Sequence, residues 1–125
     1  MITLDKRVVA TGYNGSIVGQ PHCDDVGCLM ISGHCERTIH AEMNSICQAA
    51  RYGIAIQGAT VYITCSPCWV CTKLLLNAGV KRLVFAGSYS DSRFIDAAKL
   101  AGVEIVSRPD LAEEIDKGTT GAAHA

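Results

Sequence analysis

Residues 59–79, ATVYITCSPCWVCTKLLLNAG, predict a strand that passes directly into a helix. The β-branched residues within 59–64 favour extended backbone. Ser66 is a preferred N-cap, and Pro67 suits the first helical position because the N–H that proline lacks would be unpaired there. Gly79 is a natural C-cap for this helix. The stretch therefore indicates one strand–helix unit of an α/β fold.

The same alternation of strands and helices continues on both sides of this stretch. A single domain is expected over 1–117, followed by a disordered tail over 118–125. The order of elements predicts an α/β sandwich with an at least partly parallel sheet. The expected elements are a hairpin over 2–12, a helix from Thr38 (as N-cap) to Ala50, strands over 82–86 and 103–106 with a helix over 90–101 between them, and a short helix over 110–117.

Composition excludes several classes of partner. The chain has 125 residues, of which 49% are hydrophobic, so it can bury the core of one domain. Its formal charge is −1, whereas proteins that bind nucleic acid through the phosphates normally carry a basic excess. The apolar runs are too short to span a bilayer, and the first residues lack the features of a signal peptide. We therefore expect a cytoplasmic protein without a nucleic-acid or membrane partner.

Seven cysteines are an unusual number for a chain of this length. Because the count is odd and the cytosol is reducing, structural disulfides are disfavoured. The thiols are then metal ligands, nucleophiles or small packed side chains. Cys47 lies on an apolar helix and Cys65 ends a strand, so both are expected to be packed thiols.

Two expected helix starts together carry a candidate metal site. Cys68 and Cys71 share a helix face at spacing i, i+3 and can bind one ion, with His40 as the third ligand. Zinc with three protein ligands keeps its fourth position for a water of near-neutral pKa. Glu42 is not needed as a ligand and can take and return the proton of that water. Each motif alone has a simpler interpretation, a surface histidine or an unrelated Cys-x-x-Cys, but together they match the signature of zinc deaminases.

A second group of ligand-type residues lies in residues 15–37, which are expected to form a long loop because they contain few periodic apolar positions. Such a loop could be ordered by a closed zinc site with four ligands. Neighbouring side chains seldom face one ion, so His34 competes with Cys35 and His22 with Cys23, while Cys28 and Cys35 are the preferred ligands. The alternative is that none of the five binds metal. The candidates are His22, Cys23, Cys28, His34 and Cys35.

Over residues 2–107 the chain resembles the cytidine and deoxycytidylate deaminase family, and most closely the deoxycytidylate (dCMP) deaminases of bacterial competence operons. The resemblance implies a three-layer α/β sandwich with a mixed central sheet of about five strands. It also implies a second, structural zinc in some members. The motifs that carry the resemblance are TGYNGS at 11–16, PHCDDVGC at 21–28, GHC at 33–35, RTIHAE at 37–42 and SPCWVC at 66–71.

The resemblance further implies a reaction and its residues. Zinc would be bound by His40, Cys68 and Cys71, and Glu42 would move the proton while dCMP is hydrolysed to dUMP and ammonia. Asn14 would hydrogen-bond the sugar, although it is equally well interpreted as a turn residue of left-handed geometry beside Gly15. The expected substrate contacts are Asn14, Ala41, Tyr89 and Arg93.

Recognition of the phosphate has three candidate residues. Tyr89 and Arg93 follow the end of a strand, where open α/β sheets place their ligand crevices. Arg51 could also reach a phosphate, but it is more simply a cation at the C-terminus of a helix.

The resemblance to this family also has implications for partners, and other functions stand as alternatives to it. The resemblance implies regulation by dCTP and dTTP and a homo-oligomer, specifically a hexamer. Family members usually begin with a helix that precedes the first strand, so we expect part of the sheet to be uncovered and the monomer to be unstable. The alternatives are a deaminase of tRNA, a free nucleoside or another base, and a catalytically silent zinc-binding assembly protein. Glu42 favours catalysis, because a purely structural site has no use for an unliganded carboxylate.

Overall fold

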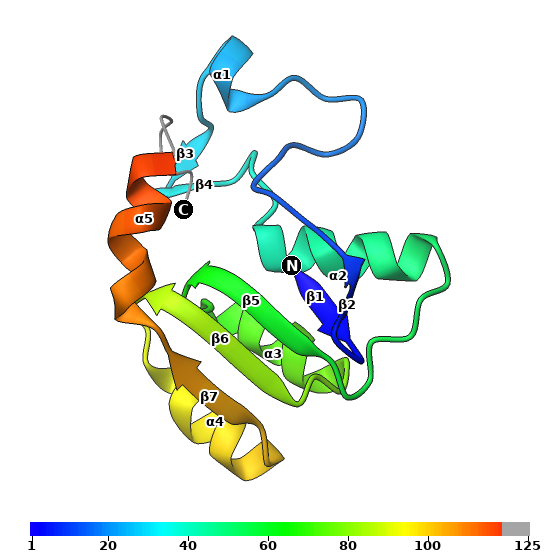
Figure 1. Cartoon of the computed structure of the whole chain (residues 1–125). Coiled ribbons are helices and arrows are strands. Elements are labelled where there is room, and N and C mark those ends of the chain that lie inside the picture. The colour runs from blue at the N-terminus through cyan, green and yellow to red at the C-terminus, as the bar shows by residue number, and fades with distance from the viewer. Residues whose placement is uncertain (119–125) are drawn as a thin grey trace.

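The computed structural model describes the backbone of residues 1–118 and the side chains of residues 1–115 (Figure 1). The tail expected over 118–125 therefore lies outside the described residues from residue 119 onward. None of the helices formed within residues 1–118 combines the length and the apolar character that a membrane-spanning segment needs.

A five-stranded mixed sheet forms the centre of the fold, with the strand order β2-β1-β5-β6-β7. Its antiparallel part is the hairpin of β1 (Ile2–Leu4) and β2 (Arg7–Ala10), and β1 also pairs antiparallel with β5 (Thr60–Cys65). The strands β5, β6 (Arg82–Gly87) and β7 (Glu104–Ser107) are parallel to one another. The predicted α/β fold with a mixed five-stranded sheet is confirmed.

Three helices pack on one face of this sheet: α2 (Ala41–Arg51), α3 (Trp69–Asn77) and α4 (Arg93–Ala101). Ile2, Val61 and Leu83 are register partners on neighbouring strands, so their side chains point to the same face. All three are fully buried and share one core cluster with a residue from each helix, namely Ala49, Leu75 and Ala98. This core holds the starts of α2 and α3 side by side.

The other face of the sheet carries exposed apolar side chains. Tyr62 follows the buried Val61 and points to this face, where 38% of its surface is exposed. Val8 on the edge strand β2 is 57% exposed. Val84, the register partner of Tyr62 on β6, is buried, so the exposed apolar side chains of this face lie on β2 and β5.

The helices α2, α3 and α4 all begin later than expected. The residues expected to cap the first two of them make other contacts. The Thr38 hydroxyl lies 3.4 Å from Cys23 Sγ and 3.3 Å from Cys35 Sγ, so it does not cap α2, whose N-cap is His40. Ser66 Oγ accepts a hydrogen bond from the Tyr89 N–H (2.7 Å), and Cys68 caps α3. The helix α4 begins at Arg93 with Ser92 as N-cap, after the Asp91 carboxylate has accepted the Arg93 N–H.

The segment 15–37 is less irregular than expected. It contains a short helix α1 (Cys23–Val26) and a two-stranded hairpin of β3 (Met30–Ile31) and β4 (His34–Cys35). At the other end of the chain, the single helix expected over 110–117 is a 3-10 turn η1 (Pro109–Leu111) followed by α5 (Ala112–Gly118).

The prediction that Cys47 and Cys65 are packed thiols is wrong. Both are exposed. Cys47 lies on the side of α2 that faces away from the buried Ser45 and Ala49, and it lines an open groove of about 520 Å³. Cys65 is the last residue of β5, whose final two residues are both exposed.

Candidate active site

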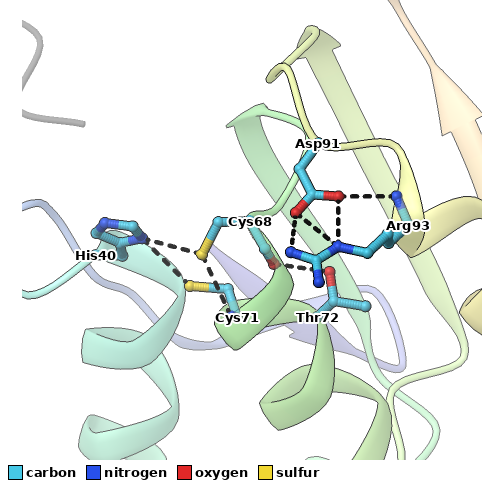
Figure 2. A network of polar contacts seen from close by, with 6 residues as sticks. All are labelled: His40, Cys68, Cys71, Thr72, Asp91 and Arg93. Carbon is cyan, nitrogen blue, oxygen red and sulfur yellow. Dashed lines mark hydrogen bonds and ion pairs between the residues drawn. The ribbon is translucent and has the colours of Figure 1, made fainter. Parts of the chain in front are cut away.

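His40, Cys68 and Cys71 meet where the starts of α2 and α3 lie side by side (Figure 2). His40 has an extended backbone (φ −61°, ψ 146°) and its imidazole does not cap the helix. Instead, His40 Nδ1 lies 3.4 Å from Cys68 Sγ and 3.5 Å from Cys71 Sγ. His40 precedes Cys68 by 28 residues and Cys71 by 31 residues, so it is the fold that brings these three side chains together.

The spacing of these three donor atoms fits a zinc ion. Nitrogen and sulfur ligands that hold zinc in tetrahedral geometry lie about 3.5 Å apart. Burial raises the pKa of the Cys71 thiol, and the nearby negative charges of Glu42 and Cys68 raise this pKa further. A divalent cation would offset that repulsion and stabilise the thiolates. The donor set and its electrostatics therefore fit zinc.

The ligand residues are held in place by the helices themselves. The Cys71 N–H approaches Cys68 Sγ at 3.5 Å, and Thr72 Oγ1 donates to the Cys68 carbonyl at 2.8 Å. Glu42 lies in the first turn of α2 beside Cys71, with which its side chain interacts. Cys71 is fully buried, whereas His40, Glu42 and Cys68 are half-buried, so one side of the group is accessible to solvent and to a substrate.

Asn14 has a role that the sequence analysis missed. Its Oδ1 accepts a hydrogen bond from the Ala41 N–H at 2.9 Å, so it pairs the first donor of α2 while His40 faces the cysteines. Its backbone is not left-handed. The loop packs tightly here, since a Cβ at Gly12 would lie 2.3 Å from the Ala41 carbonyl. A substrate contact with Asn14 or Ala41 stays a prediction and would have to share this hydrogen bond.

Arg93 lies near the metal group, in contact with two residues that the sequence analysis did not select. Its guanidinium is paired with Asp91 and lies 4.8 Å from the centre of the Trp69 ring. Tyr89 is half-buried, and its N–H is bonded to Ser66 as described above. A tryptophan directly after a candidate ligand was the available signal in the sequence. Arg51, by contrast, is the last residue of α2 and lies against Tyr52, in agreement with its interpretation as a helix-terminal cation.

The second group of candidate ligands reduces to three thiols. The Sγ atoms of Cys23, Cys28 and Cys35 lie within 4.8 Å of one another, and Cys23 and Cys35 are 3.5 Å apart. His22 and His34 are exposed and do not belong to this group, so the expected set of four ligands is not formed by these five residues.

Two of these thiols have shifted pKa values. Hydrogen bonding from Thr38 is the main cause that lowers the pKa of Cys35 to about 6. A hydrogen bond to Cys23 is the main cause that raises the pKa of Cys28 to about 11. The two shifts are opposite in sign, so the thiol of Cys35 ionises more readily than that of Cys28.

Comparisons with known proteins agree with this geometry. Residues 1–87 match the family model of the cytidine and deoxycytidylate deaminase zinc-binding region. ComE operon protein 2 of Bacillus subtilis is 52% identical over 70% of this chain, which spans 47% of that protein's length. The deoxycytidylate deaminase of Enterobacteria phage T2 is 30% identical over 89% of this chain and 80% of its own.

A solved structure shows the same fold. The dCMP deaminase of cyanophage S-TIM5, in complex with dCMP and dUMP, superposes with a TM-score of 0.74 at 29% identity, covering 85% of this chain and 76% of that one. The resemblance found in the sequence is therefore confirmed, and zinc is the metal of the matched region. The chain belongs to the cytidine and deoxycytidylate deaminase family.

Proposed function

We propose that the protein catalyses the hydrolytic deamination of dCMP to dUMP and ammonia. The observation that carries this proposal is the half-open group of His40, Cys68 and Cys71 with a carboxylate, Glu42, beside it. A structural zinc site is closed by four protein ligands, whereas a catalytic site keeps one position open. The relatives named deoxycytidylate deaminase and the dCMP-bound neighbour support the substrate.

In the proposed mechanism each residue has one task. Zinc held by His40, Cys68 and Cys71 supplies a bound water of near-neutral pKa. Glu42 would accept one proton of the attacking water, whose oxygen bonds to C4 of the cytosine ring, and would pass this proton to N3. Glu42 would then accept the proton of the new hydroxyl group on C4 and deliver it to the amino nitrogen, so that C4 becomes a carbonyl, the C4–N bond breaks and ammonia leaves. Glu42 thus ends the cycle in its starting protonation state.

Binding of the nucleotide is assigned to the residues around this group. Asn14 and Ala41, at the start of α2, are proposed to contact the sugar and base. Tyr89 and Arg93, in the segment after β6, are proposed to bind the phosphate. Arg93 is the stronger candidate because its side chain is 60% exposed and its guanidinium lies next to Trp69, the residue that follows Cys68.

A substrate panel tests the function. Ammonia release is measured with dCMP, deoxycytidine, cytidine, CMP and a cytosine-containing single-stranded oligonucleotide. We expect dCMP to exceed the oligonucleotide by at least about tenfold in kcat/KM, because the chain lacks the basic excess that a polymer requires. Faster turnover of a free nucleoside or of the oligonucleotide would contradict the assignment of dCMP. No turnover of any of these by zinc-loaded protein would favour a silent zinc-binding protein.

We also propose that Cys23, Cys28 and Cys35 bind a second zinc, whose fourth ligand comes from outside these three thiols, so that metal analysis finds two zinc ions per chain. Replacing Cys28 with serine is expected to remove one zinc and to raise the KM for dCMP more than it lowers kcat. The Thr38 hydroxyl contacts Cys23 and Cys35. The next residue, Ile39, is hydrogen-bonded through its backbone to Gly15, which follows Asn14. Loss of the metal is therefore expected to loosen the loop that carries Asn14.

The matched control for this experiment is Cys47→Ser, an exposed thiol outside both ligand groups. It is expected to keep both metal ions and the normal KM. One zinc per chain in fully active protein, or unchanged metal content after Cys28→Ser, would exclude the second site.

A homo-oligomer is proposed for the assembly, a hexamer by family resemblance, with dCTP and dTTP as regulators. The exposed Val8 and Tyr62 on the open face of the sheet support an association that buries this surface. Sedimentation is expected to show no folded monomer at micromolar concentration, and adding dCTP or dTTP is expected to change the rate of dCMP turnover. A well-folded monomer in that experiment would refute the assembly.

A further inference from the structure

A carboxylate and an aromatic ring hold one guanidinium beside the candidate active site. Asp91 accepts from Arg93 Nε at 3.0 Å through both of its oxygens, and its Oδ2 accepts from Arg93 Nη2 at 2.6 Å. Asp91 Oδ1 also accepts the Arg93 backbone N–H at 3.0 Å. The guanidinium carbon lies 4.8 Å from the centre of the Trp69 ring. A carboxylate and a ring thus define the position of a side chain that is otherwise among the most flexible in proteins.

This arrangement leaves a particular edge of the guanidinium for a ligand. The group is planar and carries five N–H donors, and Asp91 occupies the side formed by Nε and Nη2. The Nη1 edge therefore points away from Asp91. An edge with two parallel N–H donors matches the oxygen spacing of a phosphate. Asp91 therefore orients the cation and leaves the Nη1–Nη2 edge for an anion.

The held cation lies at the same end of the sheet as the metal ligands (Figure 2). Trp69 is the first residue of α3 and directly follows the candidate ligand Cys68. The segment that carries Asp91 follows β6 and is tied to the residue before Pro67 by the bond from the Tyr89 N–H to Ser66 Oγ. The guanidinium therefore has a fixed position relative to the metal group.

We infer that Asp91 and Trp69 are positioning residues that make the site select a 5′-monophosphorylated nucleoside over the free nucleoside, by presenting Arg93 to the phosphate. The inference rests on the proposed function and on the proposed role of Arg93. A preorganised guanidinium loses little side-chain entropy when the phosphate binds, whereas a free one loses much of its freedom. Removing Asp91 or Trp69 should therefore weaken nucleotide binding even though Arg93 itself is retained.

The chain contains a matched control pair. Arg108 and Asp110 have the same spacing of two residues and the same side-on geometry, with Nε–Oδ1 at 3.0 Å and Nη2–Oδ2 at 2.8 Å. They lie after β7, and the contacts described for Arg108 include no aromatic ring. Exposed pairs of this kind contribute little to stability. Asp110→Asn therefore removes an equivalent ion pair without touching the arrangement around Trp69.

The experiment compares the binding of dUMP and deoxyuridine, neither of which is a substrate for deamination, by titration calorimetry of the zinc-loaded protein. Wild-type protein and Asp110→Asn are expected to bind dUMP at least about tenfold more tightly than deoxyuridine. In Asp91→Asn and Trp69→Leu this ratio is expected to fall to below about threefold, with Trp69→Phe retaining part of it. In kinetics, the same variants should raise the KM for dCMP and leave kcat and the turnover of deoxycytidine unchanged.

The outcomes separate this inference from the proposed function. An unchanged dUMP-to-deoxyuridine ratio in Asp91→Asn and Trp69→Leu, with Arg93→Gln losing it, would overturn the positioning role while the function stands. Failure of wild-type protein to release ammonia from dCMP would contradict the proposed function, but the binding ratios would still decide the positioning role. Equal loss of the ratio in Asp110→Asn would show a general effect of charge and would also overturn the inference.

Discussion

Replacing Glu42 with glutamine is expected to reduce the turnover of dCMP by about 10²–10⁴-fold while zinc remains bound. The amide has nearly the same size as the carboxylate and leaves His40, Cys68 and Cys71 untouched, but it cannot accept the proton of the attacking water. Removing its negative charge beside Cys71 should also favour the thiolate, so the affinity for zinc should not fall. Steady-state kinetics and metal analysis of the same preparation test both statements.

The control for this variant is Glu104→Gln on β7, a carboxylate that is 65% exposed and paired with Arg82. It makes the same chemical change in a strand remote from the metal group and is expected to keep normal turnover. Near-normal activity of Glu42→Gln would show that another group moves the proton. Loss of zinc from that variant would mean that Glu42 supports the metal and not the proton transfer.

Replacing Cys71 with serine is expected to remove the catalytic zinc and to lower turnover by at least about 10³-fold. Cys71 is fully buried and contributes one of only three ligands, and a hydroxyl is a much poorer zinc ligand than a thiolate. Because metal binding stabilises the folded state, the midpoint of thermal unfolding should also fall and should no longer respond to added zinc.

Cys47→Ser serves as the control here too, since its thiol is exposed on the outer side of α2. It should keep the zinc content, the turnover and the unfolding midpoint of the wild type. Full zinc occupancy together with normal turnover in Cys71→Ser would remove the basis for the proposed site.

The local features of the fold were predictable because they depend on residues close in sequence. The hairpin over 2–12 and the strands that became β5, β6 and β7 follow from β-branched runs bounded by turn residues. The grouping of Cys68 with Cys71 follows from spacing on one helix, and the link to His40 from a known signature. The glycine that ends α4, Gly102, was recognised correctly and has the left-handed backbone that favours this residue.

The helix starts were predicted incorrectly, because the side chains that cap helices in isolation are used elsewhere in the folded chain. Thr38 contacts two thiols from residues 23 and 35, and Ser66 accepts the Tyr89 N–H 23 residues away. Asn14 reaches the start of α2 across 27 residues. A local rule cannot anticipate such contacts, since they exist only after the loops have folded onto the sheet.

The α/β class and the family follow from the sequence, and so does the choice of His40, Cys68 and Cys71 as candidate metal ligands, which the structure places within reach of one ion. The packing of the folded chain fixes which members of the second group come together. His34 and Cys35 are neighbours on β4, so their side chains point to opposite sides, and only Cys35 faces Cys23. The packing also fixes the surroundings of Arg93, because Trp69 and Asp91 come from different elements and no periodicity links them. Spacing along one element is written in the sequence, whereas contact between elements depends on how the sheet and its helices pack.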